Sequence, residues 1–276
     1  LAWNPTRDAL LTAGQDGIVR YWADPFAASE EWFRDAVDWV GPVRWCPAGV
    51  RWAAAVGRRV VFGAGANTVV SDPVASTVSE IAFSPTGKSV AVASYGGVRL
   101  LDPDSANVLR VLRWNGSLVS IAFSPTGSVV AAGCQDHRVH VWRVASGKDF
   151  EMTGFPTKPR SLGFNHNGKW LATAGDITIS LWPFDGKGPE GRAPVLLKGH
   201  ADVVSELAYA PLVDVVLSGA RNGEVALWTP PTARTPFAMA RLHGKIVQVA
   251  WGTAAAESCL RWAAADEHGN VLMGTF

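Results

Sequence analysis

A heptapeptide that occurs twice constrains the fold of this chain more than any other feature. IAFSPTG stands at 81–87 and again at 121–127, and seven identical residues at a fixed offset indicate an internal repeat. In the second copy, two short apolar runs flank the turn 124–127, where proline presets φ and glycine accepts a positive φ. A second turn at 135–138 leads into the alternating segment VHVW at 139–142. The repeating unit is therefore predicted to be three β-strands joined by two tight turns.

An aromatic residue marks the start of each repeat along the whole chain. The starts are separated by 38 to 45 residues. Helical repeats of similar period carry a 3.6-residue apolar periodicity, whereas these segments alternate as β-strands do, which is typical of propeller blades. Seven starts predict seven blades, and their aromatic residues are Trp3, Trp45, Phe83, Phe123, Phe164, Tyr209 and Trp251.

These motifs resemble the WD40 family over the whole chain. The resemblance rests on the period together with the strand endings VRYW, VHVW, ISLW and VALW, while the second and seventh repeats match more weakly. It implies an all-β fold, a seven-bladed β-propeller of WD40 type with four-stranded antiparallel blades. Residues 1–276 would form this single domain, with inner strands starting near 1, 43, 81, 121, 162, 207 and 249.

Each blade also needs an outer strand, and the sequence offers six of them for seven blades. The sequence ends on a third strand, so the closing blade is expected to lack its outer strand here. In related propellers the N-terminus supplies that strand. We therefore expect an upstream segment, or else a partner strand, to pair with the open edge. The six candidate outer strands are 31–34, 67–71, 107–114, 149–153, 194–198 and 237–242.

The resemblance also implies a structural brace, because WD40 blades are commonly held by hydrogen-bonded His, Ser or Thr, Trp and Asp. The sixth repeat supplies His200, Ser218 and Trp228, with Asn222 where Asp is usual. Asparagine accepts a hydrogen bond without a charge, so its contact with His200 should be weaker. Histidine, serine and an acid could alternatively form a catalytic triad. However, these residues recur at the spacing of the repeat, which favours a structural brace. The other brace residues are Thr12, Asp16 and Trp22, then Asp136 and Trp142 with Ala132 at the hydroxyl position, and Asp176 and Trp182.

One local cluster could in principle bind zinc. Cys134, His137 and His140 lie close together in the sequence, but a tight turn separates the cysteine from His140 on a hairpin whose faces alternate. A turn histidine, a strand histidine and a buried thiol explain the same residues. We therefore predict no metal, no cofactor and no catalytic residue.

The charge balance and the cysteine count indicate which kinds of partner this protein binds and in which compartment it resides. The 25 Lys and Arg against 24 Asp and Glu leave a net charge of +1, which gives no bulk field for nucleic acid or anionic membrane. The three cysteines, Cys46, Cys134 and Cys259, are too few and too scattered for a disulfide framework, which favours a reducing compartment. We expect a monomeric cytoplasmic protein. Its many Arg and Ala residues favour a bacterial source.

In the WD40 family, partners most often bind the face where each outer strand turns into the next inner strand and where the second strand turns into the third. We predict a non-catalytic scaffold that binds a protein or peptide there. Trp39 is either part of that surface or packs beneath the first long connection. The alternatives are a regulatory propeller module of a larger protein, or a propeller hydrolase or metal-dependent enzyme. Offsets from the repeat starts place on this face Trp39, Tyr95, Gln15, Gln135, Lys158, Arg221 and Lys245.

Overall fold

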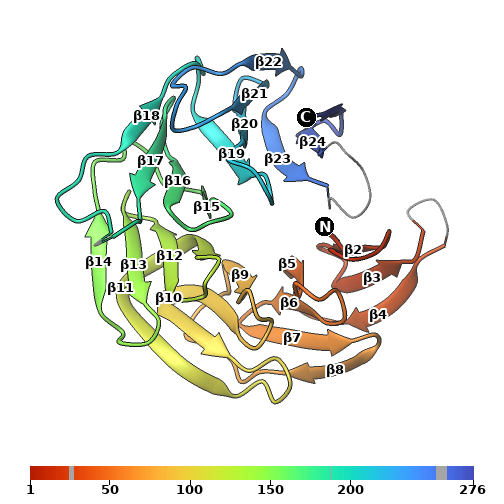
Figure 1. Cartoon of the computed structure of the whole chain (residues 1–276). Coiled ribbons are helices and arrows are strands. Elements are labelled where there is room, and N and C mark those ends of the chain that lie inside the picture. The colour runs from red at the N-terminus through yellow and green to blue at the C-terminus, as the bar shows by residue number, and fades with distance from the viewer. Residues whose placement is uncertain (25–27, 187, 253–259) are drawn as a thin grey trace.

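The chain forms a ring of antiparallel β-sheets around a central channel (Figure 1). The structure is a computed structural model that describes residues 1–24, 28–186, 188–252 and 260–276. In these residues no helix is long and apolar enough to cross a membrane. In each sheet the first strand of a repeat lies nearest the channel, and the later strands follow outward. The all-β propeller of WD40 type is thus confirmed as an architecture.

The strands follow the repeat in chain order. The first sheet contains β1 (Ala2–Trp3), β2 (Leu10–Ala13), β3 (Ile18–Trp22) and β4 (Glu30–Arg34), and the second β5 (Val40–Trp45), β6 (Trp52–Val56), β7 (Arg59–Ala64) and β8 (Asn67–Val70). The third contains β9 (Glu80–Phe83), β10 (Val90–Leu101), β11 (Val108–Phe123), β12 (Val129–Cys134), β13 (Val139–Arg143) and β14 (Asp149–Met152). The fourth contains β15 (Ser161–Phe164), β16 (Trp170–Ala174), β17 (Ile179–Pro183) and β18 (Val195–Leu197). The fifth contains β19 (Val204–Tyr209), β20 (Val216–Ala220), β21 (Glu224–Trp228) and β22 (Ala238–Arg241), and the sixth β23 (Ile246–Trp251), β24 (Arg261–Asp266) and β25 (Val271–Thr275).

The prediction of seven blades is wrong, because the described strands form six sheets. The third and fourth repeats share one six-stranded sheet, in the order β14-β13-β12-β11-β10-β9. The 16-residue strand β11 causes the fusion, since it pairs with β10 along its first part and with β12 along its second. Residues 115–117 were expected to lie in the connection between the outer strand 107–114 and the next inner strand. They stay extended instead, and Tyr95 pairs with Ser117.

The duplicated heptapeptide folds in the same way at both places. The Ser84 hydroxyl accepts a hydrogen bond from the Ser89 N–H at 3.1 Å, and the Ser124 hydroxyl accepts one from the Val129 N–H at the same distance. The glycine of each copy has a φ of +70°, a conformation that L side chains rarely adopt. The repeat thus encodes one turn between the first and second strands, as the sequence predicts.

The hydrophobic core lies between neighbouring sheets rather than in one central mass. One cluster joins Leu11 and Val19 of the first sheet to Trp52 of the second, and another joins the fourth sheet to the fifth. Trp52, Trp142 and Trp228 are among the largest fully buried side chains. Burial of a side chain of this size stabilises the fold by roughly 1.5–3 kcal/mol. The sheets are therefore held in a ring by apolar contacts between their faces.

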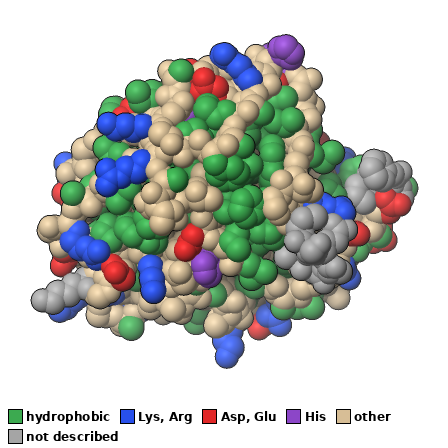
Figure 2. All heavy atoms as spheres, turned by 45° about the horizontal axis from the view of Figure 1, so that its top comes forward, with side chains coloured by type: hydrophobic (Ala, Val, Ile, Leu, Met, Phe, Trp, Pro, Cys, Tyr) green, Lys and Arg blue, Asp and Glu red, His purple; other side chains and the backbone are tan. Residues whose placement is uncertain are grey.

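Outer strands occur at all six expected positions, and the sixth sheet has three described strands with β25 at its edge. Exposed apolar side chains gather near this edge, where the Phe237 and Phe276 rings lie 5.8 Å apart. Figure 2 shows hydrophobic side chains in a band on the side of the ring where the fifth and sixth sheets lie. Residues of the first and sixth sheets, Trp3 and Trp251 among them, line one cavity of about 260 Å³.

Candidate functional site

One side of the ring carries the two kinds of segment that we expected to bind a partner, and we call it the turn face. The topology places both kinds together, because the second and fourth strands of an antiparallel blade run in the same direction. The turn after the second strand and the connection after the fourth strand therefore begin on the same side of the ring. It consists of the turns 14–17, 57–58, 135–138, 175–178, 221–223 and 266–269 and the connections 35–39, 71–79, 153–160, 198–203 and 242–245. In the six-stranded sheet the paired strand segments 95–97 of β10 and 114–117 of β11 take the place of a turn and a connection.

Hydrogen bonds tie the turns of this face to the neighbouring connections. The Gln135 N–H donates to the Ser117 carbonyl at 2.9 Å, and the Arg221 N–H donates to the Val203 carbonyl at 3.0 Å. In the last sheet the Lys245 carbonyl accepts from the Glu267 N–H at 2.9 Å. Each turn is thus fixed against its neighbour, so the backbone of the face is ordered before any partner binds.

The seven predicted partner-binding residues all lie on the turn face. Trp39 is 64 % exposed and Tyr95 is 52 % exposed, so the Trp39 indole does not pack beneath the first connection. The other five are polar: Gln15, Gln135, Arg221 and Lys245 are exposed and Lys158 is half-buried. They belong to different repeats and are spread around the ring, so any partner that touches several of them must extend across the face.

Carboxylates fix the turns that present these side chains. Asp35 accepts backbone N–H groups of Asp38 and Val37 at 2.7 and 2.8 Å, and these hydrogen bonds lower the pKa of Asp35. Asp266 accepts the side-chain and backbone N–H groups of Asn270 and the Gly244 N–H, and its pKa falls to about 2. Both groups stay ionised at neutral pH. They hold the turn before Trp39 and the turn beside Lys245.

The fifth sheet contains a buried polar brace. The Trp228 indole N–H donates to the Ser218 hydroxyl at 2.8 Å, and His200 Nε2 lies 2.7 Å from the same oxygen. Glu224 takes the position that we expected for Asn222: its Oε2 lies 3.3 Å from His200 Nδ1. Asn222 instead accepts the Glu224 N–H at 3.2 Å. Burial lowers the pKa of His200, so the ring stays neutral at pH 7.

The other three sets of predicted brace residues are less complete. The Trp22 and Trp182 indoles donate to threonine hydroxyls, those of Thr12 and Thr173, each at 3.0 Å. In the fourth repeat Ala132 stands at the hydroxyl position, and the Trp142 indole donates to the Arg113 carbonyl at 3.2 Å instead. The three aspartates bond locally within their own turns: Asp16 with Arg20 and the Ile18 N–H, Asp136 with Arg138, and Asp176 with Thr178.

Two enzymatic interpretations have specific geometric obstacles. Ser218 stands beside a His–Glu pair as a triad serine would, but its exposed fraction is 0 %, so a substrate has no access to it. Burial raises the pKa of the Cys134 thiol to about 12, which keeps the free thiol protonated at neutral pH. His140 Nε2 is occupied by Asp149 Oδ2 at 2.8 Å. Among the described residues no three His, Cys, Asp or Glu side chains are grouped to hold a metal ion.

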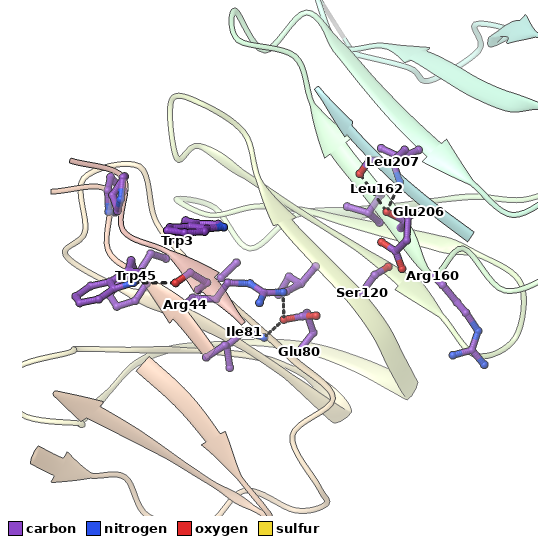
Figure 3. Close-up of a pocket in the computed structure, with 17 residues that line it drawn as sticks. Trp3, Arg44, Trp45, Glu80, Ile81, Ser120, Arg160, Leu162, Glu206 and Leu207 are labelled. Carbon is purple, nitrogen blue, oxygen red and sulfur yellow. Dashed lines mark hydrogen bonds and ion pairs between the residues drawn. The ribbon is translucent and has the colours of Figure 1, made fainter. Parts of the chain in front are cut away.

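The central channel contains a cavity of about 490 Å³ that sequence reasoning did not predict. The first strands of five sheets line it (Figure 3). On one side, Arg44 forms a 2.9 Å ion pair with Glu80, and on the other Glu206 stands on β19. Its volume falls within the roughly 300–1,000 Å³ range of small-molecule sites.

Glu206 is the most perturbed acid of the cavity. Burial raises its pKa to about 7, and the negative charge of Glu80 adds to this shift. The Ser161 hydroxyl, Arg44 and Lys245 act in the opposite direction. At neutral pH the carboxyl is therefore close to half ionised.

The sequence does contain a signal for this cavity. Three residues before the repeat's aromatic residue, the inner strand carries a polar side chain in five of the seven repeats. Because side chains alternate along a strand, residues in a shared register face the same way, and all of these except Gln248 line the cavity. The five residues are Glu80, Ser120, Ser161, Glu206 and Gln248.

Comparison with known proteins agrees with this geometry. A family model described as "WD domain, G-beta repeat" matches residues 107–143 and 151–183. The findings support the WD40 family. The fold of this WD40-type propeller is also found in a solved structure described as "Crystal Structure of Mitotic Checkpoint Complex", with a TM-score of 0.81 over 100 % of this chain and 89 % of that one. At 16 % identity, this likeness shows the fold alone.

Curated relatives match part of the chain. "Transcriptional corepressor LEUNIG_HOMOLOG" of Arabidopsis thaliana is 29 % identical over 155 residues, which are 54 % of this chain and 19 % of that protein. "Small ribosomal subunit protein RACK1" of Glycine max is 31 % identical over 91 residues, 33 % of this chain and 28 % of that protein. The chain thus matches less than a third of the length of either relative. Both are plant proteins, and the bacterial source stays a prediction.

Proposed function

We propose that this WD40-type propeller is a non-catalytic scaffold that binds a protein or peptide on its turn face. The exposure of Trp39 and Tyr95 on a hydrogen-bonded frame is the observation that carries the proposal. Tryptophan, tyrosine and arginine are enriched among the residues that dominate binding energy at protein interfaces. A face that is ordered in advance also loses little conformational entropy on binding.

The similar proteins support a role in assemblies. Their printed names describe a corepressor, a small ribosomal subunit protein and a mitotic checkpoint complex. Cys46 and Cys134 are free and buried, which supports a reducing, cytoplasmic setting, while Cys259 lies outside the described residues. The near-zero net charge supports a protein partner over nucleic acid or membrane, and we propose that the propeller is monomeric.

A capture experiment with two matched triple variants tests this proposal. The face variant carries Trp39→Ala, Arg221→Glu and Lys245→Glu. The control variant carries Leu212→Ala, Lys88→Glu and Lys148→Glu, which make similar chemical changes at exposed positions in turns on the opposite side of the ring. Each protein is immobilised and exposed to a lysate of the source organism, and a retained protein is then purified for affinity measurement.

We expect the wild type and the control variant to retain the same protein. The face variant should bind it at least tenfold more weakly, because loss of one hot-spot residue costs about 2 kcal/mol or more and a tenfold change needs only about 1.4 kcal/mol. Equal retention by the face variant and the wild type would refute the turn face as the binding surface. All three proteins must first show the same circular dichroism spectrum and unfolding midpoint.

A regulatory module of a larger protein is the second candidate. It is favoured by one observation: the 155 residues matched in the corepressor relative are only 19 % of that protein's length. An antibody against the propeller, used on whole-cell extract, would detect a native polypeptide well above 29.4 kDa in that case.

A further inference from the structure

The channel cavity has an uneven distribution of charge. The guanidinium of Arg44 is occupied twice, by the Glu80 carboxylate at 2.9 Å and by the Val43 carbonyl at 2.9 Å. The charge of Glu80 is therefore already balanced. Among the described residues Glu206 has no ion-pair partner within the cavity, and Figure 3 shows the Arg160 side chain extending away from it. The two arginines and two glutamates that line the cavity balance in number, but among the described residues no cation lies in ion-pair contact with the Glu206 carboxylate.

The rest of the wall is mixed, with Ser120 and Ser161 beside aromatic and aliphatic side chains. Trp3 is 50 % exposed and lines the cavity together with Ile81, Leu162 and Leu207. The face of an indole attracts a cation through its quadrupole, and the aliphatic side chains favour the carbon atoms of an organic ligand. A bare metal ion would leave most of a cavity of about 490 Å³ unfilled.

We propose that the channel cavity binds an organic cation with a guanidinium or ammonium group, with the Glu206 carboxylate as its counter-charge and the Trp3 indole as its wall. A cation of this kind can belong to a free small molecule or to a basic side chain of a peptide. The proposal does not rest on the function proposed for the turn face, because it uses other residues in the channel. The proposal excludes an anionic ligand, because the unpaired Glu206 carboxylate would repel it.

The ionisation of Glu206 gives the proposal a measurable pH dependence. Only the ionised carboxylate attracts a cation, and its pKa is raised to about 7 by burial, with Glu80 raising it further and Arg44, Lys245 and Ser161 lowering it. The ionised fraction therefore rises about tenfold between pH 6 and pH 8, and affinity should rise with it.

Calorimetric titration with a matched pair of probes tests the site. N-Acetyl-L-argininamide carries the cation, and N-acetyl-L-citrullinamide has nearly the same shape without the charge. A capped peptide, Gly-Gly-Arg-Gly-Gly, presents the same side chain within a chain. The proteins are the wild type, Glu206→Gln, and Glu190→Gln, which removes the same charge from an exposed position outside the cavity.

At pH 8 we expect the arginine probe to bind the wild type and Glu190→Gln at least tenfold more tightly than the citrulline probe. Glu206→Gln should lose this preference and its pH dependence. Equal binding of the two probes, or an unchanged preference in a folded Glu206→Gln variant, would overturn the proposal. A peptide that binds tenfold more tightly than the free probe identifies a side chain as the ligand, and equal affinity identifies a free small molecule.

Discussion

The buried brace of the fifth sheet leads to a quantitative prediction for Ser218→Ala. The serine oxygen serves two groups at once, since it accepts the Trp228 indole N–H at 2.8 Å and lies 2.7 Å from His200 Nε2. Ser218 and Trp228 are both 0 % exposed, so water cannot replace the lost contacts. Alanine therefore leaves two polar nitrogen atoms without a partner in the interior.

The expected cost follows from these contacts. Leaving one buried polar group without a hydrogen bond costs roughly 1–3 kcal/mol, so two groups give a loss of about 3 kcal/mol in the free energy of unfolding. This is a large part of the roughly 5–15 kcal/mol that stabilises an ordinary domain. Thr173→Val is the matched control, because it removes a hydroxyl that accepts one indole N–H, that of Trp182, at 3.0 Å and otherwise makes only a longer, 3.3 Å bond to the Ser180 carbonyl. We expect it to cost about 1 kcal/mol.

Urea unfolding followed by tryptophan fluorescence and circular dichroism measures both costs. The comparison requires equal slopes of free energy against urea, so that a shift in midpoint reports stability alone. If Ser218→Ala costs no more than Thr173→Val, the two hydrogen bonds to Ser218 do not stabilise the sheet as we argue. Trp142, which has no hydroxyl opposite it and donates to a backbone carbonyl, shows that a WD40 blade can also fold with a different acceptor.

Three further predictions concern other sites. Glu206→Gln should be more stable than the wild type at pH 8 and equally stable near pH 4. The pKa of about 7 in the folded state lies above the ordinary value of 4.5, so the ionised carboxylate destabilises the wild type increasingly as the pH rises from 4.5 to 7. Chemical unfolding at both pH values checks this, and a constant difference would contradict it. The His140 ring lies 4.0 Å from that of Trp114, and its Nδ1 is buried without a partner. In the free energy of unfolding, His140→Phe should cost no more than about 1 kcal/mol and His140→Ala roughly 2–4 kcal/mol. Because burial lowers the pKa of His140, the wild type should lose stability below pH 6.5, and the Phe variant should lose less. Gly97→Ala should lower the free energy of unfolding by more than about 2 kcal/mol, because the φ of Gly97 is +115° and a Cβ there would lie 2.1 Å from a backbone oxygen. Gly65→Ala, at a φ of +60° in open space, should cost about 1 kcal/mol. Equal shifts in the thermal midpoints of the two variants would count against this reasoning.

Much of the fold could be predicted from the sequence because its determinants are local. The SPTG turns at 84–87 and 124–127 need only a serine hydroxyl, a proline and a glycine within a few residues. The outer strands likewise follow from short apolar alternation between turn residues, and β4, β8, β14, β18 and β22 begin within one residue of their expected starts. The turn face also follows directly, because strand order fixes the end at which each connection emerges.

Side-chain partners that come from different segments could not be predicted in this way. Glu224 rather than Asn222 meets His200, because the choice depends on how far a side chain reaches across a turn. The sheet count failed for a similar reason. Residues 115–117 have turn-like composition, yet pairing of β10 and β12 with the two parts of β11 keeps this segment extended.

The sequence by itself determined a ring of antiparallel strands, its repeat period and the side of the ring on which Trp39 and Tyr95 lie. Only the tertiary structure decided that two repeats share one sheet and that Glu206 faces the channel with an unpaired carboxylate. The physical reason is distance along the chain: turns and alternation are set by neighbours a few residues apart. The charge of a cavity depends on strands such as β5, β9 and β19, which only the closed ring brings together.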